Sequence, residues 1–150
     1  MNRILKVLFI GLLFLSPQDP ADYFTNPIGQ GADPWITKVD GFYYASFSGA
    51  GKNSKNFITI TKSTSLTQLG ERKIVWVAPQ EGWNSNCIWA PEIHFLNGKW
   101  YIYYAAGKSG PPYAFQRSGL LELASANAQG KYIDKGVLKT GDDEIFTLPK

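Results

Sequence analysis

The chain has 150 residues, so a single domain of ordinary size is the default expectation. Aromatic residues make up 15% and charged residues only 18%, which supports a packed core and excludes a disordered chain. The formal net charge of +3 is spread over dispersed Lys and Arg side chains, and this excludes the clustered basic surface that binds nucleic acid.

The N-terminus has the pattern of a secretory signal peptide. A basic region over residues 2–6 is followed by an apolar stretch, Val7 to Leu15, that is too short to span a bilayer. No clear A-x-A cleavage site follows, so a buried N-terminal strand or helix remains the alternative. We predict a signal peptide over residues 1–20, a secreted or periplasmic protein without a stable membrane anchor, and a folded part over residues 21–150.

The first part after this leader predicts four consecutive strands. Trp35–Val39 and Phe42–Ser48 flank Asp40-Gly41, a strong signal for a tight hairpin turn. Two further runs, Phe57–Thr61 and Ile74–Val77, are rich in residues that favour strands. Four strands in this order are typical of one blade of a β-propeller.

The same order of elements returns 57 positions later. Ile93–Leu96 and Trp100–Ala105 flank Asn97-Gly98, and strands are predicted over Leu120–Ala124 and Tyr132–Val137. We expect no helix longer than the leader. Most aromatic residues of the second strand in each repeat are expected to fill the space between sheets, and a position facing the channel is the alternative for one or two of them: Tyr43, Tyr44, Trp100, Tyr101, Tyr103 and Tyr104.

Repeated strands at this period indicate propeller blades. A closed propeller needs four to eight blades, and closure protects the sheet edges. Two blades are therefore expected to belong to a larger propeller or to an assembly, and self-association of the open sheet is a further expectation.

A carboxylate stands beside the proline of each repeat, Asp33 in the first and Glu92 in the second. A residue before proline is driven toward an extended conformation, so we expect an extended Asp33 at the start of the innermost strand, beside the central channel. Gly29, Gly31 and Ala32 are expected to keep the approach clear. A carboxylate there can hold a water molecule for general-base attack, whereas an Asp that caps a turn is the common alternative.

Glu92 follows Trp89 closely, and a Trp beside carboxylates is typical of a sugar site, because the ring stacks on the sugar while carboxylates bind hydroxyl groups. Packing of Trp89 between blades, and a strand-end salt bridge or backbone cap for Glu92, are the alternatives. His94 is interpreted as a partly buried side chain, because no metal-binding set of His and Cys surrounds it. The single cysteine, Cys87, cannot form an internal disulfide, and we interpret it as a small buried apolar residue.

These stretches together resemble the start of a glycoside hydrolase family 43 enzyme. The stretches are Gly31–Trp35 with Asp40–Tyr44, Ile58–Ser63, Ile88–His94, and Asn97–Tyr101. Their order and spacing are similar to the first two blades of that family's five-bladed propeller. The resemblance runs from about Asn26 to Val137.

The resemblance implies an all-β chain that forms the N-terminal two-blade portion of this propeller. It implies inverting hydrolysis of α-L-arabinofuranosyl or β-xylosyl linkages in plant cell-wall polysaccharides or oligosaccharides. It places the general base at Asp33 and substrate contacts at Trp89, Ala90 and Glu92, to which we add Trp35. No cofactor is required, no metal ligands are predicted in this chain, and the full-length family fold is compatible with a calcium ion in its channel.

Asp33 and Glu92 could be taken as the two carboxyl groups that an inverting glycosidase needs, but the resemblance argues against this pairing. The family's pKa-modulating Asp and general-acid Glu belong to later blades, and no position of this chain matches them. We therefore expect little or no activity from the chain alone. The alternatives are a non-catalytic carbohydrate-binding fragment that uses Trp35, Trp89 and Glu92, and a non-functional product of a broken reading frame.

Overall fold

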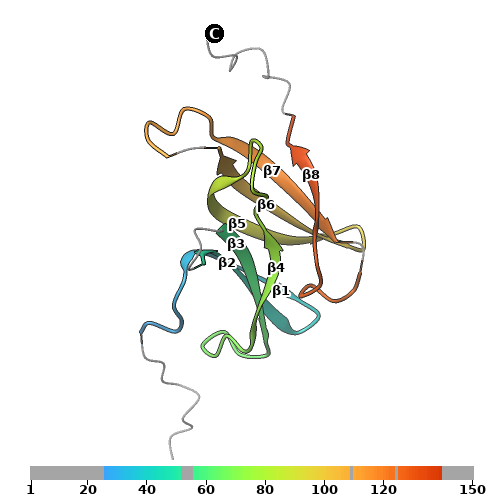
Figure 1. The fold of residues 1–150 in the computed structure, drawn as a ribbon. Coiled ribbons are helices and arrows are strands. Elements are labelled where there is room, and N and C mark those ends of the chain that lie inside the picture. Colours follow the sequence, from blue (N-terminus) through green and yellow to red (C-terminus); the bar gives the residue numbers. More distant parts are fainter. Residues whose placement is uncertain (1–25, 52–55, 109, 124, 140–150) are drawn as a thin grey trace, which may run out of the picture.

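The computed structural model describes residues 26–51, 56–108, 110–123 and 125–139 (Figure 1). The predicted signal peptide lies outside these residues. The described part is all β, with eight strands in two four-stranded antiparallel sheets, and each sheet follows the order of the sequence. Among the described residues, no helix is long and apolar enough to cross a membrane.

The first sheet contains the four strands predicted for the first repeat. They are β1 (Ala32–Val39), β2 (Phe42–Ala50), β3 (Asn56–Ser63) and β4 (Arg72–Val77). Three of these strands begin earlier than the apolar pattern predicts, and β1 includes Asp33.

The second sheet contains the strands of the second repeat. They are β5 (Asn86–Leu96), β6 (Lys99–Gly107), β7 (Arg117–Leu123) and β8 (Ile133–Val137). The start predicted for β5, Ile93, is wrong by seven residues, because the strand continues past Pro91 through two irregularities in its pairing with β6. Trp89 and Ala90 are therefore strand residues.

The two repeats have the same register. Trp35 pairs with Ser46 in the first sheet, and Glu92 pairs with Tyr103 at the equivalent place in the second. Both hairpins turn through residues with positive φ, Asp40 at 48° and Asn97 at 51°, each followed by a glycine at 80°. Positive φ at both central residues suits the right-handed twist of the flanking strands, which explains the Asp-Gly and Asn-Gly pairs.

The main core lies between the two sheets, which are stacked with β5 against the first sheet (Figure 1). Alternate residues of β6 are buried, and the ring of Trp100 lies 4.6 Å from that of Tyr44 on β2. The aromatic prediction is confirmed for the side chains that are nearly inaccessible: Tyr44, Trp100 and Tyr104. The other three are only half-buried, because they point to the other face of their strands: Tyr43, Tyr101 and Tyr103.

Polar contacts also join the sheets. The loop between β7 and β8 reaches the first sheet, where Gln129 Nε2 donates hydrogen bonds of 2.9 Å to the carbonyl oxygens of Ile60 and Glu71. The amide of Tyr132 donates to the carbonyl of Val75 at 3.1 Å. These bonds occupy backbone acceptors of the first sheet, so the two blades are fixed against each other by polar as well as apolar contacts.

Candidate functional site

Asp33 lies at a bulge in the pairing of β1 with β2. The pairing passes from Ala32↔Ser48 to Trp35↔Ser46, so two residues of β1 stand opposite one residue of β2. The φ angle of Asp33 is 53°, and the extended conformation expected from the following proline is therefore wrong. The bulge turns the backbone into the left-handed region, a conformation that persists only where surrounding contacts hold it.

Two hydrogen bonds hold the Asp33 carboxylate, and both reach the same oxygen. Ser48 Oγ donates to Oδ2 at 2.9 Å, and the backbone amide of Ala90 donates to Oδ2 at 3.1 Å. Because Ala90 belongs to β5, this carboxylate joins the two blades. No described residue donates a hydrogen bond to Oδ1, and Asp33 is exposed to solvent. One carboxylate oxygen is thus fixed, and the other is open to a water molecule.

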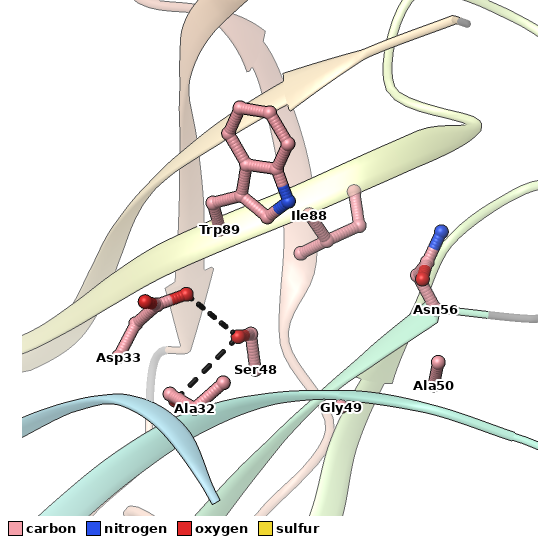
Figure 2. Close-up of a pocket in the computed structure, with 8 residues that line it drawn as sticks. All are labelled: Ala32, Asp33, Ser48, Gly49, Ala50, Asn56, Ile88 and Trp89. Carbon is pink, nitrogen blue, oxygen red and sulfur yellow. Dashed lines mark hydrogen bonds between the residues drawn. The ribbon is translucent and has the colours of Figure 1, made fainter. Parts of the chain in front are cut away.

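The carboxylate faces an open pocket of about 510 Å³, a volume in the range of small-molecule sites. Figure 2 shows Asp33 directed toward Ser48 on the β2 side, whereas the indole of Trp89 rises from β5 on the opposite side. The residues that line the pocket come from both blades, and they include Ala32, Asp33, Ser48, Asn56, Ile88 and Trp89. The structure therefore brings two of the predicted site residues, Asp33 and Trp89, into one pocket.

The aromatic rings at the site are accessible. Trp35 and Trp89 are both 39% exposed, so Trp89 is not buried between the blades. Tyr113 lies edge-on to Trp89 with ring centroids 5.0 Å apart, and it is 44% exposed. Tyr113 is not among the predicted site residues, although the long proline-containing loop between β6 and β7 was a signal for it. Together, Trp89 and Tyr113 present an aromatic surface beside the pocket.

Glu92, predicted as a substrate contact, does not line the pocket of Asp33. It lines a second hollow of about 320 Å³ together with Ala90, Tyr103 and Ser118. Its Oε2 lies 3.6 Å from Nε2 of His94, so the predicted alternative of a salt bridge is present when His94 is protonated.

His94 is partly buried, as predicted, and it connects Glu92 to two aromatic rings. Its ring centroid lies 5.4 Å from that of Trp35 and 5.6 Å from that of Tyr103. Trp35 on β1 thus contacts His94, which lies next to Glu92 at the wall of the second hollow. Ala90 donates its amide to Asp33 and also lines this hollow.

A buried polar network supports the second hollow. Asn84 Nδ2 donates hydrogen bonds to the hydroxyl of Tyr104 at 2.8 Å and to Asp134 Oδ2 at 2.6 Å. Burial raises the pKa of the Tyr104 hydroxyl above its usual value, and the nearby Asp134 carboxylate acts in the same direction. Tyr104 therefore stays neutral at physiological pH, and its hydroxyl group takes part in hydrogen bonds at the wall of the hollow.

Two smaller expectations, about the glycines before Asp33 and about Cys87, are corrected. Gly29 and Gly31 allow close packing rather than a clear approach, because a Cβ atom would come within 2.3 Å of Leu69 and 2.5 Å of Phe47, respectively. Cys87 lies near the start of β5 and is only half-buried, so the expectation of a buried cysteine is wrong.

The described residues contain no group of three or more His, Cys, Asp or Glu side chains that could hold a metal ion. The calcium ion expected in the channel of the full-length family fold therefore stays a prediction.

Comparison with known proteins places these observations in context. The family model of "Glycosyl hydrolases family 43" matches residues 24–146. The extracellular exo-alpha-(1->5)-L-arabinofuranosidase of Streptomyces avermitilis is 37% identical over 130 residues, which cover 83% of this chain and 26% of that protein. A protein of the same name from Streptomyces chartreusis is 32% identical over 142 residues, which cover 92% of this chain and 42% of that protein.

Among solved structures, the alpha-L-arabinofuranosidase from Lactobacillus brevis superposes with a TM-score of 0.68 at 28% identity. The match covers 80% of this chain and 40% of that chain. The chain thus spans only a quarter to two fifths of the length of these proteins.

Proposed function

The chain belongs to glycosyl hydrolase family 43, with two sheets that are the first two four-stranded blades of the family's five-bladed propeller, and we propose that it carries the general base and part of the sugar pocket of an inverting glycosidase. The proposed substrates are α-L-arabinofuranosyl linkages, or β-xylosyl linkages, in polysaccharides or oligosaccharides of the plant cell wall. The names of the Streptomyces and Lactobacillus relatives favour the arabinofuranosyl linkage.

The geometry of Asp33 carries this proposal. An inverting glycosidase needs a carboxylate that accepts a proton from water while the water attacks the anomeric carbon. Oδ1 of Asp33 is open at the pocket, and Oδ2 is held by two donors, so the carboxylate is oriented for this step. A second carboxyl group, about 6.5–9.5 Å from the first, must protonate the leaving oxygen. We assign that acid to none of the described residues.

The sugar contacts are proposed at Trp35, Trp89, Ala90 and Glu92. The exposed face of Trp89 suits stacking against a sugar ring, and Glu92 suits a hydroxyl group at the wall of the neighbouring hollow. Secretion or export to the periplasm is part of the proposal, because the leader has the pattern of a signal peptide and two relatives are named as extracellular.

The first test uses the 150-residue chain and a chimera. We expect no turnover of an aryl α-L-arabinofuranoside by the chain alone, because none of the described residues is assigned as the acid. In the chimera, residues 24–146 replace the matching segment of the Lactobacillus brevis enzyme, and we expect them to restore turnover with inversion at the anomeric carbon. NMR of the first product measures the inversion.

Two results would contradict this proposal. One is turnover by the chain alone that disappears on Asp33→Asn, since the chain would then contain its own acid. The other is a correctly folded chimera without activity, since the grafted blades would then lack a working base or pocket.

A second candidate function, non-catalytic carbohydrate binding, is favoured by the exposed rings of Trp35, Trp89 and Tyr113. If the chain binds sugar by stacking, Trp89→Ala is expected to weaken binding of an arabino-oligosaccharide about tenfold, equivalent to about 1.4 kcal/mol. Isothermal titration of the chain with the oligosaccharide measures this change. Ile74→Ala, which removes an exposed apolar side chain from outer strand β4, is the control and should leave the affinity unchanged.

A further inference from the structure

The second blade provides a comparison for the first within the same chain. When residue numbers are shifted by 57, the pair Ala32↔Ser48 of the first sheet corresponds to the pair Trp89↔Ala105 of the second. Asp33 then corresponds to Ala90, and Ser48 corresponds to Ala105. The carboxylate and the hydroxyl group that donates to it are therefore both replaced by alanine in the second blade.

The backbone at these positions is nevertheless the same. Asp33 has a φ of 53° and Ala90 a φ of 45°, each precedes a proline, and each lies where the strand register shifts. The second blade thus forms its bulge without a carboxylate or a serine. The Asp33–Ser48 pair is therefore not needed to build the bulge. Its role must lie in the chemistry of the site.

The hydroxyl of Ser48 has a defined direction. The side chain is buried, at 8% exposure, and its Oγ lies 2.9 Å from Asp33 Oδ2 but 3.5 Å from the carbonyl oxygen of Ala32 (Figure 2). A hydroxyl carries one proton, and a charged acceptor forms the shorter and stronger bond. The Ser48 proton therefore goes to Asp33, to the oxygen that also accepts from Ala90.

We propose that Ser48 is a positioning residue, which holds Oδ2 of Asp33 against the Ala90 amide and so fixes Oδ1 as the oxygen that faces the pocket. This inference rests on the proposed role of Asp33 as the general base. With Ser48 in place, the carboxylate has two donors on one oxygen and cannot turn about its Cβ–Cγ bond without losing both. The orientation of the base therefore depends on Ser48 and on the contact between the two blades.

The test measures hydrogen exchange at single amides of the 150-residue chain by NMR. Ser48→Ala is expected to speed exchange of the Ala90 amide about five- to tenfold, because the freed carboxylate no longer stays in place as its acceptor. Ser48→Thr, which keeps a hydroxyl group, should restore the rate to within about twofold. The Gly136 amide serves as the reference, because it donates to a carboxylate at 2.8 Å within the second blade.

Ser46→Ala is the matched control, since it removes a buried serine hydroxyl two positions away that donates to the Pro91 carbonyl instead. Because Pro91 is next to Ala90, some increase is expected, but the ratio of Ala90 to Gly136 exchange should rise clearly less than in Ser48→Ala. An unchanged Ala90 rate in Ser48→Ala, an equal rise at Gly136, or no rescue by threonine would each overturn the inference. The measurement does not involve turnover, so its failure is distinct from failure of Asp33 as the base.

Discussion

Asp33→Asn in the active chimera is expected to lower kcat by about 10²- to 10⁴-fold, with a much smaller change in KM. Asparagine keeps the shape of the side chain, and its carbonyl oxygen can still accept from Ser48 and from the Ala90 amide. The group that faces the pocket is then an amide, which cannot take a proton from water. Initial rates with an aryl α-L-arabinofuranoside measure the effect.

Asp40→Asn is the control for this substitution. Asp40 lies at the β1–β2 turn, and the second blade carries Asn97 at the equivalent turn with nearly the same φ, 51° against 48°. The chain itself therefore shows that asparagine fits there, and the rate should stay within about twofold. A loss below tenfold in Asp33→Asn, or an equal loss in Asp40→Asn, would mean that Asp33 is not the base.

The sequence predicted most of the fold, because the hairpin turns carry strong local signals. Asp40-Gly41 and Asn97-Gly98 set the registers of both blades, and the register observed is the same in each. The extended start of β5 was missed for a local reason. Proline usually marks the beginning or edge of a strand, whereas Pro91 lies within one, at a place where the register shifts.

The site could be predicted only in part. The proline that follows Asp33 at the start of a repeat points to this residue, but the partners that hold its carboxylate are not predicted, since they are distant in sequence. Ser48 lies 15 positions away and Ala90 lies 57 positions away. The Ala90 contact uses a backbone amide, so the identity of the side chain at this position does not indicate the contact. Such contacts become visible only once the two blades are packed together.

Trp100→Ala is expected to cost about 3–5 kcal/mol of unfolding free energy, a large share of the 5–15 kcal/mol typical of a domain. Trp100 is 2% exposed, and its ring lies 4.6 Å from that of Tyr44 in the other sheet and 4.8 Å from that of Phe95. Its Nε1 also donates to the carbonyl oxygen of Ala126 at 3.4 Å. Alanine would leave a cavity where the two sheets meet. Urea unfolding of the 150-residue chain measures the loss.

Trp89→Ala removes the same side chain from the same sheet and is the matched control. Because Trp89 is 39% exposed, its removal should change the unfolding free energy by no more than about 0.5 kcal/mol. The two variants should therefore show opposite patterns, with stability lost only in Trp100→Ala and sugar affinity lost specifically in Trp89→Ala. Equal destabilisation by both, or a cost below about 1 kcal/mol for Trp100→Ala, would contradict a core shared between the sheets at Trp100. The Ala90 contact to Asp33 depends on that packing, so a chain that lost it would also lose the orientation of the base.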